Sequence, residues 1–235
     1  CWAKERLKKC EKVISENIKK IKNTIHECCK NCNKDPEEII LIGASKSQSI
    51  SKIKEALNSG LTHFGENYLQ EAEEKMDEVG DGVIWHFIGS IQSRKAKRIS
   101  EVFDWVHTVD SLKVAKKLDT FRPIEKGPLN VCVQINIDNE ETKSGLKVNE
   151  LEKFLYEVVK LKNLELRGLM AIPRPREKEV DQRHVFRQIR DELINLQNKG
   201  FKLDMLSMGM SSDYGAAIKE GATMIRIGTD LFGKR

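Results

Sequence analysis

The chain has 235 residues, of which 39% are hydrophobic and 33% are charged, and its formal net charge is +5. This length suits one large α/β domain better than two small ones, so we expect a single domain over residues 1–235. No apolar run approaches the roughly 18 residues that a membrane span requires, and the charged N-terminus does not resemble a secretory signal. We therefore expect a cytoplasmic protein without membrane contact.

The positive charge is concentrated at the N-terminus. Residues 1–34 contain ten Lys or Arg and four Glu, whereas the remainder contains 31 basic and 32 acidic residues. Few aromatic residues accompany these lysines, which favours a solvated helix face over a nucleic-acid-binding segment. Apolar residues recur there at steps of three and four, as in one stripe of a long amphipathic helix. This stripe consists of Leu7, Cys10, Ile14, Ile18, Ile21, Ile25 and Cys28.

The same segment carries a C-x-x-C pair, Cys29 and Cys32. A zinc site needs a second pair of ligands, and His26 adds only one candidate. We therefore expect no metal site, and we interpret the cysteines as reduced thiols.

From residue 39 onward, short apolar runs alternate with helical patterns. The predicted strands lie near residues 39–44, 61–64, 83–88, 103–108, 130–137, 165–171, 203–208 and 223–227. The predicted helices lie near residues 50–58, 67–78, 91–100, 111–119, 147–160, 179–198 and 212–220. This alternation predicts a (β/α)8 TIM-type barrel, to which the helix of residues 1–34 is an addition. An open doubly wound sheet is the alternative.

A lysine follows the first predicted strand. Residues 39–42 are four consecutive large apolar residues, a run too short for a buried helix and typical of a strand buried on both faces. Lys46 comes shortly after this run, where the chain turns towards a helix. Chemistry in such barrels takes place at the carboxyl ends of the strands, so Lys46 is a candidate reactive residue. A solvated lysine at a strand end is the alternative.

Glycines and hydroxyl residues follow the last two predicted strands. Barrel enzymes often hold a phosphate between these two loops through backbone N–H groups. Gly209 and Gly228 permit a close backbone approach, and Ser211, Ser212 and Thr229 add hydroxyl donors. The sequence therefore predicts a phosphate site. The alternative is that the serines only cap the helix that follows.

Arg226 alternates with Ile225 and Ile227 in the last predicted strand, so it faces the opposite side from them. A buried arginine needs an acceptor, either an acidic side chain or a ring nitrogen of a bound cofactor. The combination of Lys46, a phosphate site and Arg226 meets the requirements of pyridoxal 5′-phosphate (PLP). This cofactor needs an amine for its Schiff base, donors for its phosphate and a partner for its pyridine nitrogen.

Two further polar residues lie at the ends of predicted strands. His86 and Asn67 are candidates for contact with the cofactor ring or its hydroxyl group. The alternatives are a histidine that donates to a backbone carbonyl and an asparagine that caps a helix. The sequence does not decide between these interpretations.

At several of these residues the chain resembles the pyridoxal phosphate homeostasis protein family, which is related to the N-terminal barrel of alanine racemase. The matching stretches, in order within residues 36–235, are Ser45–Lys46, Phe64–Tyr68, Trp85–Gly89, Lys143–Leu146, Leu166–Pro173, Leu206–Ser211 and Arg226–Thr229. The chain departs from the family pattern at residues 47–49, Ser90 and Arg94.

The resemblance implies that Lys46 carries PLP as a Schiff base and that Arg226 lies near the pyridine nitrogen. It also implies that the loops after the seventh and eighth strands surround the phosphate. Met170 and Ser207, which lie in matching stretches, join the expected cofactor-binding residues.

The resemblance leaves open whether the barrel is a carrier or an enzyme. An arginine donates to the pyridine nitrogen and leaves it unprotonated, which weakens the ring as an electron sink. Racemisation also needs acid–base groups on both faces of the substrate carbon, and in alanine racemase another domain supplies the second one. We therefore expect a monomer that holds PLP for intracellular PLP homeostasis, supplies PLP-dependent apoenzymes and has no robust catalytic activity. A PLP-dependent amino-acid racemase that uses Tyr68 or Tyr214 is the alternative.

Overall fold

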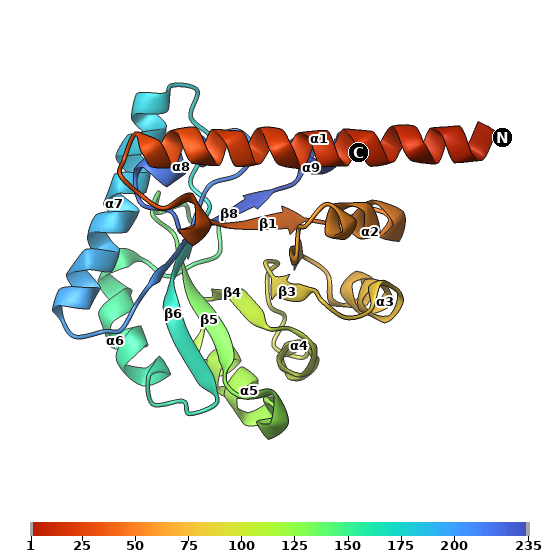
Figure 1. Cartoon of the computed structure of the whole chain (residues 1–235). Coiled ribbons are helices and arrows are strands. Elements are labelled where there is room, and N and C mark those ends of the chain that lie inside the picture. The colour runs from red at the N-terminus through yellow and green to blue at the C-terminus, as the bar shows by residue number, and fades with distance from the viewer. Residues whose placement is uncertain (1, 234–235) are drawn as a thin grey trace.

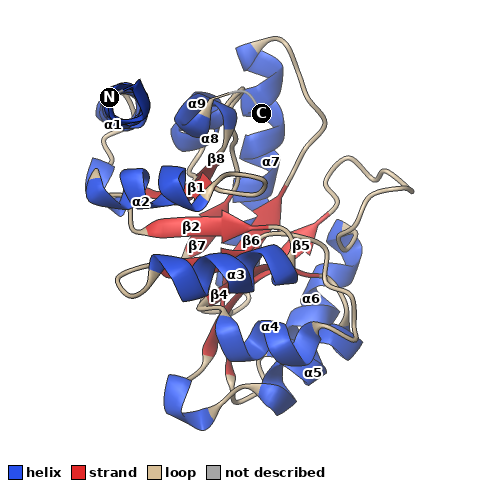
Figure 2. Ribbon diagram, turned by 90° about the vertical axis from the view of Figure 1, so that its right-hand side faces the viewer, coloured by secondary structure: helices blue, strands red, loops and turns tan. Residues whose placement is uncertain are grey.

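The chain forms a closed barrel of eight parallel strands that follow one another in sequence order (Figure 1). The computed structural model describes the backbone of residues 2–233 and the side chains of residues 13–233. Helices surround the strands, as Figure 2 shows. The predicted (β/α)8 TIM-type barrel is confirmed, and the alternative of an open doubly wound sheet is wrong.

Each predicted strand overlaps one observed strand. The strands are β1 (Ile40–Ala44), β2 (His63–Glu66), β3 (Ile84–Phe87), β4 (Trp105–Val109), β5 (Leu129–Ile135), β6 (Leu164–Ala171), β7 (Met205–Ser207) and β8 (Met224–Ile227). β8 pairs with β1, which closes the barrel and sets Arg226 opposite Ile42. Because the strands are covered on both faces, they are mostly apolar along their length.

The helices are α1 (Trp2–Lys30), α2 (Ile50–Asn58), α3 (Leu69–Val79), α4 (Ala96–Val102), α5 (Leu112–Phe121), α6 (Val148–Val158), α7 (Glu179–Asn198), α8 (Tyr214–Lys219) and α9 (Thr229–Phe232). Short 3-10 turns are η1 (Pro36–Glu38) and η2 (Ile124–Lys126). α4 begins at Ala96 rather than near residue 91, and the sequence pattern did not predict α9. No helix within residues 2–233 is long and apolar enough to cross a membrane.

α1 lies along the outside of the barrel against α2, α8 and α9, and Figure 2 views it end-on beside them. Its Ile14, Ile18, Ile21 and Ile25 are buried, so this stripe packs onto the barrel helices. The expected extension of the stripe to Leu7 and Cys10 lies outside the described side chains.

Apolar side chains fill part of the barrel interior. Ile42, Trp105, Cys132, Met170 and Met224 pack together in one cluster inside the ring of strands. Burial raises the pKa of the Cys132 thiol to about 12, so this thiol stays protonated.

Five polar side chains in the interior form a continuous line. His63 Nδ1 lies 2.9 Å from His86 Nε2, and His86 Nδ1 lies 2.9 Å from His107 Nε2. His107 Nδ1 lies 2.7 Å from the Ser207 hydroxyl, which accepts a 2.6 Å hydrogen bond from Arg226 Nη1. We call these five residues the histidine chain. It crosses the barrel from β2 to β8.

The histidines of this chain are neutral at pH 7. Burial lowers the pKa of His86 well below its usual value, and the neighbouring His107 and His63 lower it further. Burial and the Arg226 guanidinium lower the pKa of His107 to about 3. Burial also lowers the pKa of His63. The barrel interior thus excludes a positive charge on these rings.

We predict that this interior makes the free energy of unfolding depend on pH. In the unfolded chain each histidine binds a proton as the pH falls below the usual histidine pKa of about 6.5. Folded His107, whose pKa is lowered to about 3, stays neutral in this range. Stability is therefore lost as the pH falls below about 6.5, and His107 alone accounts for about 2 kcal/mol of this loss at about pH 5. Urea denaturation at about pH 7.5 and pH 5 measures this loss.

The variant His107→Leu tests whether the buried histidines cause this pH dependence. It removes one group that binds a proton only when the chain unfolds. We expect it to lose less stability than the wild type between the two pH values. His184→Gln, at an exposed position of α7, is the matched control and retains the wild-type loss. Equal losses in His107→Leu and His184→Gln would contradict the assignment.

Candidate functional site

A cavity of about 410 Å³ lies at the carboxyl end of the strands. Its lining comprises Ala44, Lys46, Gln48, Asn67, Ile88, Ile172, Met210, Ser211, Ser212, Arg226, Gly228, Thr229 and Gly233. The structure thus brings together the lysine after β1 and the loops after β7 and β8. Seven of the ten residues expected to bind a cofactor are among these lining residues, and the other three are not.

Lys46 is half-buried in the turn that follows β1. Buried polar contacts fix the residues around it. The hydroxyl of Ser45 donates to Glu66 Oε1 at 2.6 Å, and Lys75 Nζ donates to the Ser45 carbonyl at 2.7 Å. The backbone N–H of Ser47 donates to Glu71 Oε1. Both neighbours of Lys46 are therefore held, and Lys46 itself lines the cavity.

Glu66 and Lys75 form a buried ion pair beneath this turn, with Lys75 Nζ 2.7 Å from Glu66 Oε1. Burial raises the pKa of Glu66, while its hydrogen bonds from Lys75 and Ser45 act in the opposite direction. The role of Lys75 was not predicted from the sequence, because its position in an amphipathic helix indicates a solvated lysine. The signal that was available is Glu66, a carboxylate at the end of a buried strand that needs a cationic partner.

Gly209 shapes the loop after β7. Its φ of +97° is unfavourable for other residues, and a Cβ there would lie 2.7 Å from the Ala217 Cβ. The carboxylate of Asp213 accepts a 2.7 Å hydrogen bond from the Met210 N–H, so it closes this loop instead of capping α8.

The loop after β7 is joined to α9, the helix that follows β8. Ser211 Oγ accepts a 3.3 Å hydrogen bond from the N–H of Asp230 in α9, so this serine links the loop to α9 and does not cap α8. Ser212 and Thr229 are exposed at the cavity wall, and Gly228 is half-buried beside them. The wall therefore offers hydroxyl and backbone N–H donors to an anion.

Arg226 is only 4% exposed, and its guanidinium reaches the cavity from inside the barrel. Nη1 donates to Ser207 Oγ at 2.6 Å, and Nη2 donates to the Ala171 carbonyl at 3.0 Å. Burial lowers the pKa of Arg226 to about 10, while the charge of Asp213 opposes this change. Its hydrogen-bond partners in the described structure are neutral, so the acidic partner considered above is not what holds it.

Three expected cofactor-binding residues lie inside the barrel, outside the cavity lining. They are His86, Met170 and Ser207, all fully buried. His86 bonds to two other histidines and not to a backbone carbonyl, and Ser207 contacts Arg226. Direct contact between these three residues and a cofactor stays a prediction.

Asn67 lines the cavity from the loop after β2. It does not cap α3, whose N-cap residue is Tyr68. Gly89 passes so close to it that an added Cβ would lie 2.1 Å from the Asn67 carbonyl oxygen. The absence of a side chain at Gly89 therefore lets these two loops pack together. Tyr68 is 60% exposed, and neither it nor Tyr214 is among the residues that line the cavity.

Comparison with known proteins finds a matching protein family and several similar proteins. Residues 14–235 match the family described as alanine racemase, N-terminal domain. A pyridoxal phosphate homeostasis protein of Pseudomonas aeruginosa is 48% identical over 223 residues, which cover 94% of this chain and 96% of that protein. One of Escherichia coli strain K12 is 44% identical over 226 residues, with 94% and 97% covered.

Solved structures agree with this relationship. PipY of Synechococcus elongatus, solved with PLP bound, is 34% identical and has a TM-score of 0.82. The match covers 94% of this chain and 100% of PipY. The barrel, its cavity and these relatives together show that the chain belongs to the pyridoxal phosphate homeostasis protein family.

Proposed function

We propose that this chain binds PLP in the cavity at the carboxyl end of the barrel and serves PLP homeostasis. The observation that carries this proposal is that the Lys46 amine, the Arg226 guanidinium and the donor-rich loops line one cavity of about 410 Å³. Its relatives support the proposal, because they are named pyridoxal phosphate homeostasis proteins and PipY was solved with PLP bound.

The cavity residues fit the parts of the cofactor. When bound, PLP supplies an aldehyde that condenses with a primary amine and releases water. Lys46 would provide that amine. Ser211, Ser212, Thr229 and the backbone of Gly228 would hold the phosphate through hydroxyl and N–H groups.

Arg226 would orient the ring through its pyridine nitrogen. Because a guanidinium only donates, that nitrogen would stay unprotonated, which disfavours carbanion chemistry. Tyr68 and Tyr214, the acid–base candidates for racemisation, are not among the residues that line the cavity. The expected state of the ring nitrogen and the position of the tyrosines both support a carrier over an enzyme. We propose a monomeric, cytoplasmic carrier whose recipients are PLP-dependent apoenzymes.

We predict that Lys46→Ala abolishes covalent retention of PLP. The wild type should show the absorbance of a lysine-bound PLP, and borohydride reduction followed by peptide mapping should locate the label on Lys46. Lys54→Ala, at an exposed position of α2 outside the cavity, is the matched control and should behave as the wild type. A PLP-loaded wild type without this absorbance would refute the proposed attachment.

We predict that Gly228→Ala weakens the binding of PLP about tenfold and leaves the binding of pyridoxal, which lacks the phosphate, nearly unchanged. The new methyl group fits the protein, since it would lie 3.5 Å from the Ala44 carbonyl oxygen, but it would obstruct the phosphate. Gly215→Ala, in α8 and outside the cavity lining, is the control. Equal losses for both ligands would place the phosphate elsewhere.

We predict that the PLP-loaded protein does not accelerate exchange of the alanine Cα proton with deuterium above the rate of free PLP. The physical reason is the absence of a tyrosine acid–base group from the cavity lining. NMR of alanine in heavy water measures this rate. An acceleration that Lys46→Ala removes would instead support the racemase.

A further inference from the structure

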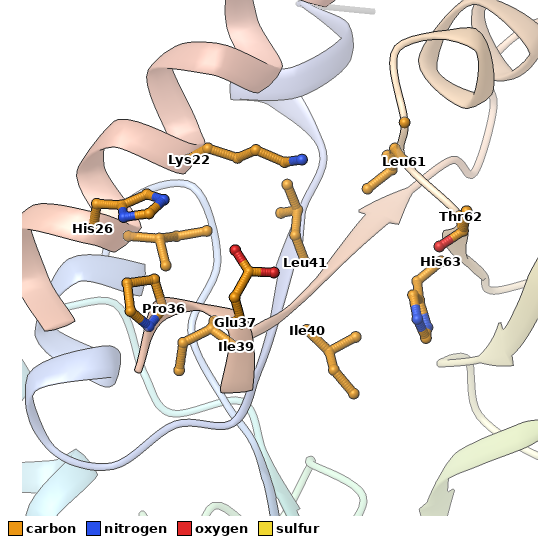
Figure 3. Close-up of a pocket in the computed structure, with 12 residues that line it drawn as sticks. Lys22, His26, Pro36, Glu37, Ile39, Ile40, Leu41, Leu61, Thr62 and His63 are labelled. Atoms are coloured by element: carbon orange, nitrogen blue, oxygen red, sulfur yellow. The ribbon is translucent and has the colours of Figure 1, made fainter. Parts of the chain in front are cut away.

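The histidine chain joins the candidate cofactor site to the opposite end of the barrel. A second cavity, of about 250 Å³, lies at that end, between α1, η1 and the starts of β1 and β2. Figure 3 shows His63 in its lining, near Ile40 and Thr62, with Lys22 and Glu37 across the cavity. The histidine chain therefore has one end at each cavity. His63 is its end at this second cavity, and Arg226 is its end at the candidate cofactor site.

The direction of the hydrogen bonds in this chain follows from Arg226. A guanidinium donates and never accepts, so the bond between Arg226 Nη1 and Ser207 Oγ uses a lone pair of the hydroxyl. The hydroxyl proton of Ser207 must then find an acceptor. Among the described side chains, the other atom within hydrogen-bond distance of Ser207 Oγ is His107 Nδ1, at 2.7 Å. Ser207 therefore donates to His107.

Each later bond then has one possible direction. A neutral histidine that accepts at Nδ1 carries its proton on Nε2. His107 therefore donates from Nε2 to His86 Nδ1, and His86 donates from Nε2 to His63 Nδ1. His63 accepts at Nδ1, so it too carries its proton on Nε2. All three rings thus have the same tautomer.

The reverse order leaves a buried donor without a partner. If His63 donated to His86 and His86 to His107, then His107 Nδ1 would donate to Ser207 Oγ. That oxygen would accept from His107 and from Arg226, and the hydroxyl proton would have no acceptor. Ser207 is fully buried, and among residues 13–233 its hydroxyl has hydrogen-bond contacts with those two side chains only. Buried donors are rarely left unpaired, so the reverse order is disfavoured.

We propose that Ser207, His107 and His86 are positioning residues, which hold Arg226 through one directional hydrogen-bond chain that ends at His63. Because the Ser207 hydroxyl donates its proton to His107, its lone pairs remain available to accept the hydrogen bond from Arg226. The part of this inference that concerns ligand affinity rests on the proposed binding of PLP. The order of the protons does not, because it follows from the protein alone.

The first test is histidine nitrogen NMR of the wild-type protein without ligand. We expect His63, His86 and His107 all to carry their proton on Nε2 at neutral pH. A proton on Nδ1 of any of the three rings would overturn the proposal. This measurement needs no variant, and it stands whether or not the protein binds PLP.

The second test measures whether the histidine chain fixes the position of the Arg226 guanidinium. His107→Leu removes the acceptor of the Ser207 proton, so we expect faster rotation of the Arg226 guanidinium in arginine NMR spectra of the ligand-free protein. We also expect PLP to bind about tenfold more weakly, as for one lost buried hydrogen-bond partner. Unchanged guanidinium rotation in a folded His107→Leu protein would overturn the positioning role.

Ser100→Ala is the matched control, because it also removes a buried polar group. The Ser100 hydroxyl donates to the Lys97 carbonyl within α4, away from the histidine chain. We expect wild-type guanidinium rotation and PLP affinity in this variant. Equal changes in Ser100→Ala and His107→Leu would show a general loosening of the barrel and overturn the proposal. Failure of the wild type to bind PLP would refute the proposed function and leave both ligand-free NMR tests intact.

Discussion

The buried guanidinium of Arg226 constrains the polar interior of this barrel. An arginine that is 4% exposed keeps its charge only if its N–H groups are paired, and here the acceptors are a hydroxyl and a carbonyl. A neutral acceptor pair leaves the positive charge directed at the cavity. It also requires the nearby rings to stay neutral, which agrees with the lowered pKa of His107.

On the opposite side of the cavity, the position of Lys46 depends on a buried ion pair. Glu66 and Lys75 secure the end of β1, and they do so through Ser45, the residue before Lys46. Lys46 and Arg226 are thus both placed by contacts within the barrel, although the cavity between them is walled by loops. Rigid supports of this kind fix the distance between the Lys46 amine and the Arg226 guanidinium, which the proposed binding of PLP would require.

Much of this architecture could be predicted from the sequence, because its signals are local. The apolar run of residues 39–42 marked the first strand, and the alternation that follows it gave the barrel. Position at the strand ends then grouped Lys46 with Ser211 and Gly228. The pairing of His63, His86 and His107 could not be predicted, since it depends on which interior side chains meet across three strands. The burial of Lys75 was hidden for a similar reason, because its partner lies on another element.

The enclosed thiol of Cys132 gives the barrel an internal reporter. It has no exposed surface, and its pKa is raised to about 12, so the reactive thiolate is scarce while the strands stay closed. An alkylating reagent would therefore modify it only during openings of the barrel. The rate of that modification would report these openings from inside the barrel, without an engineered cysteine.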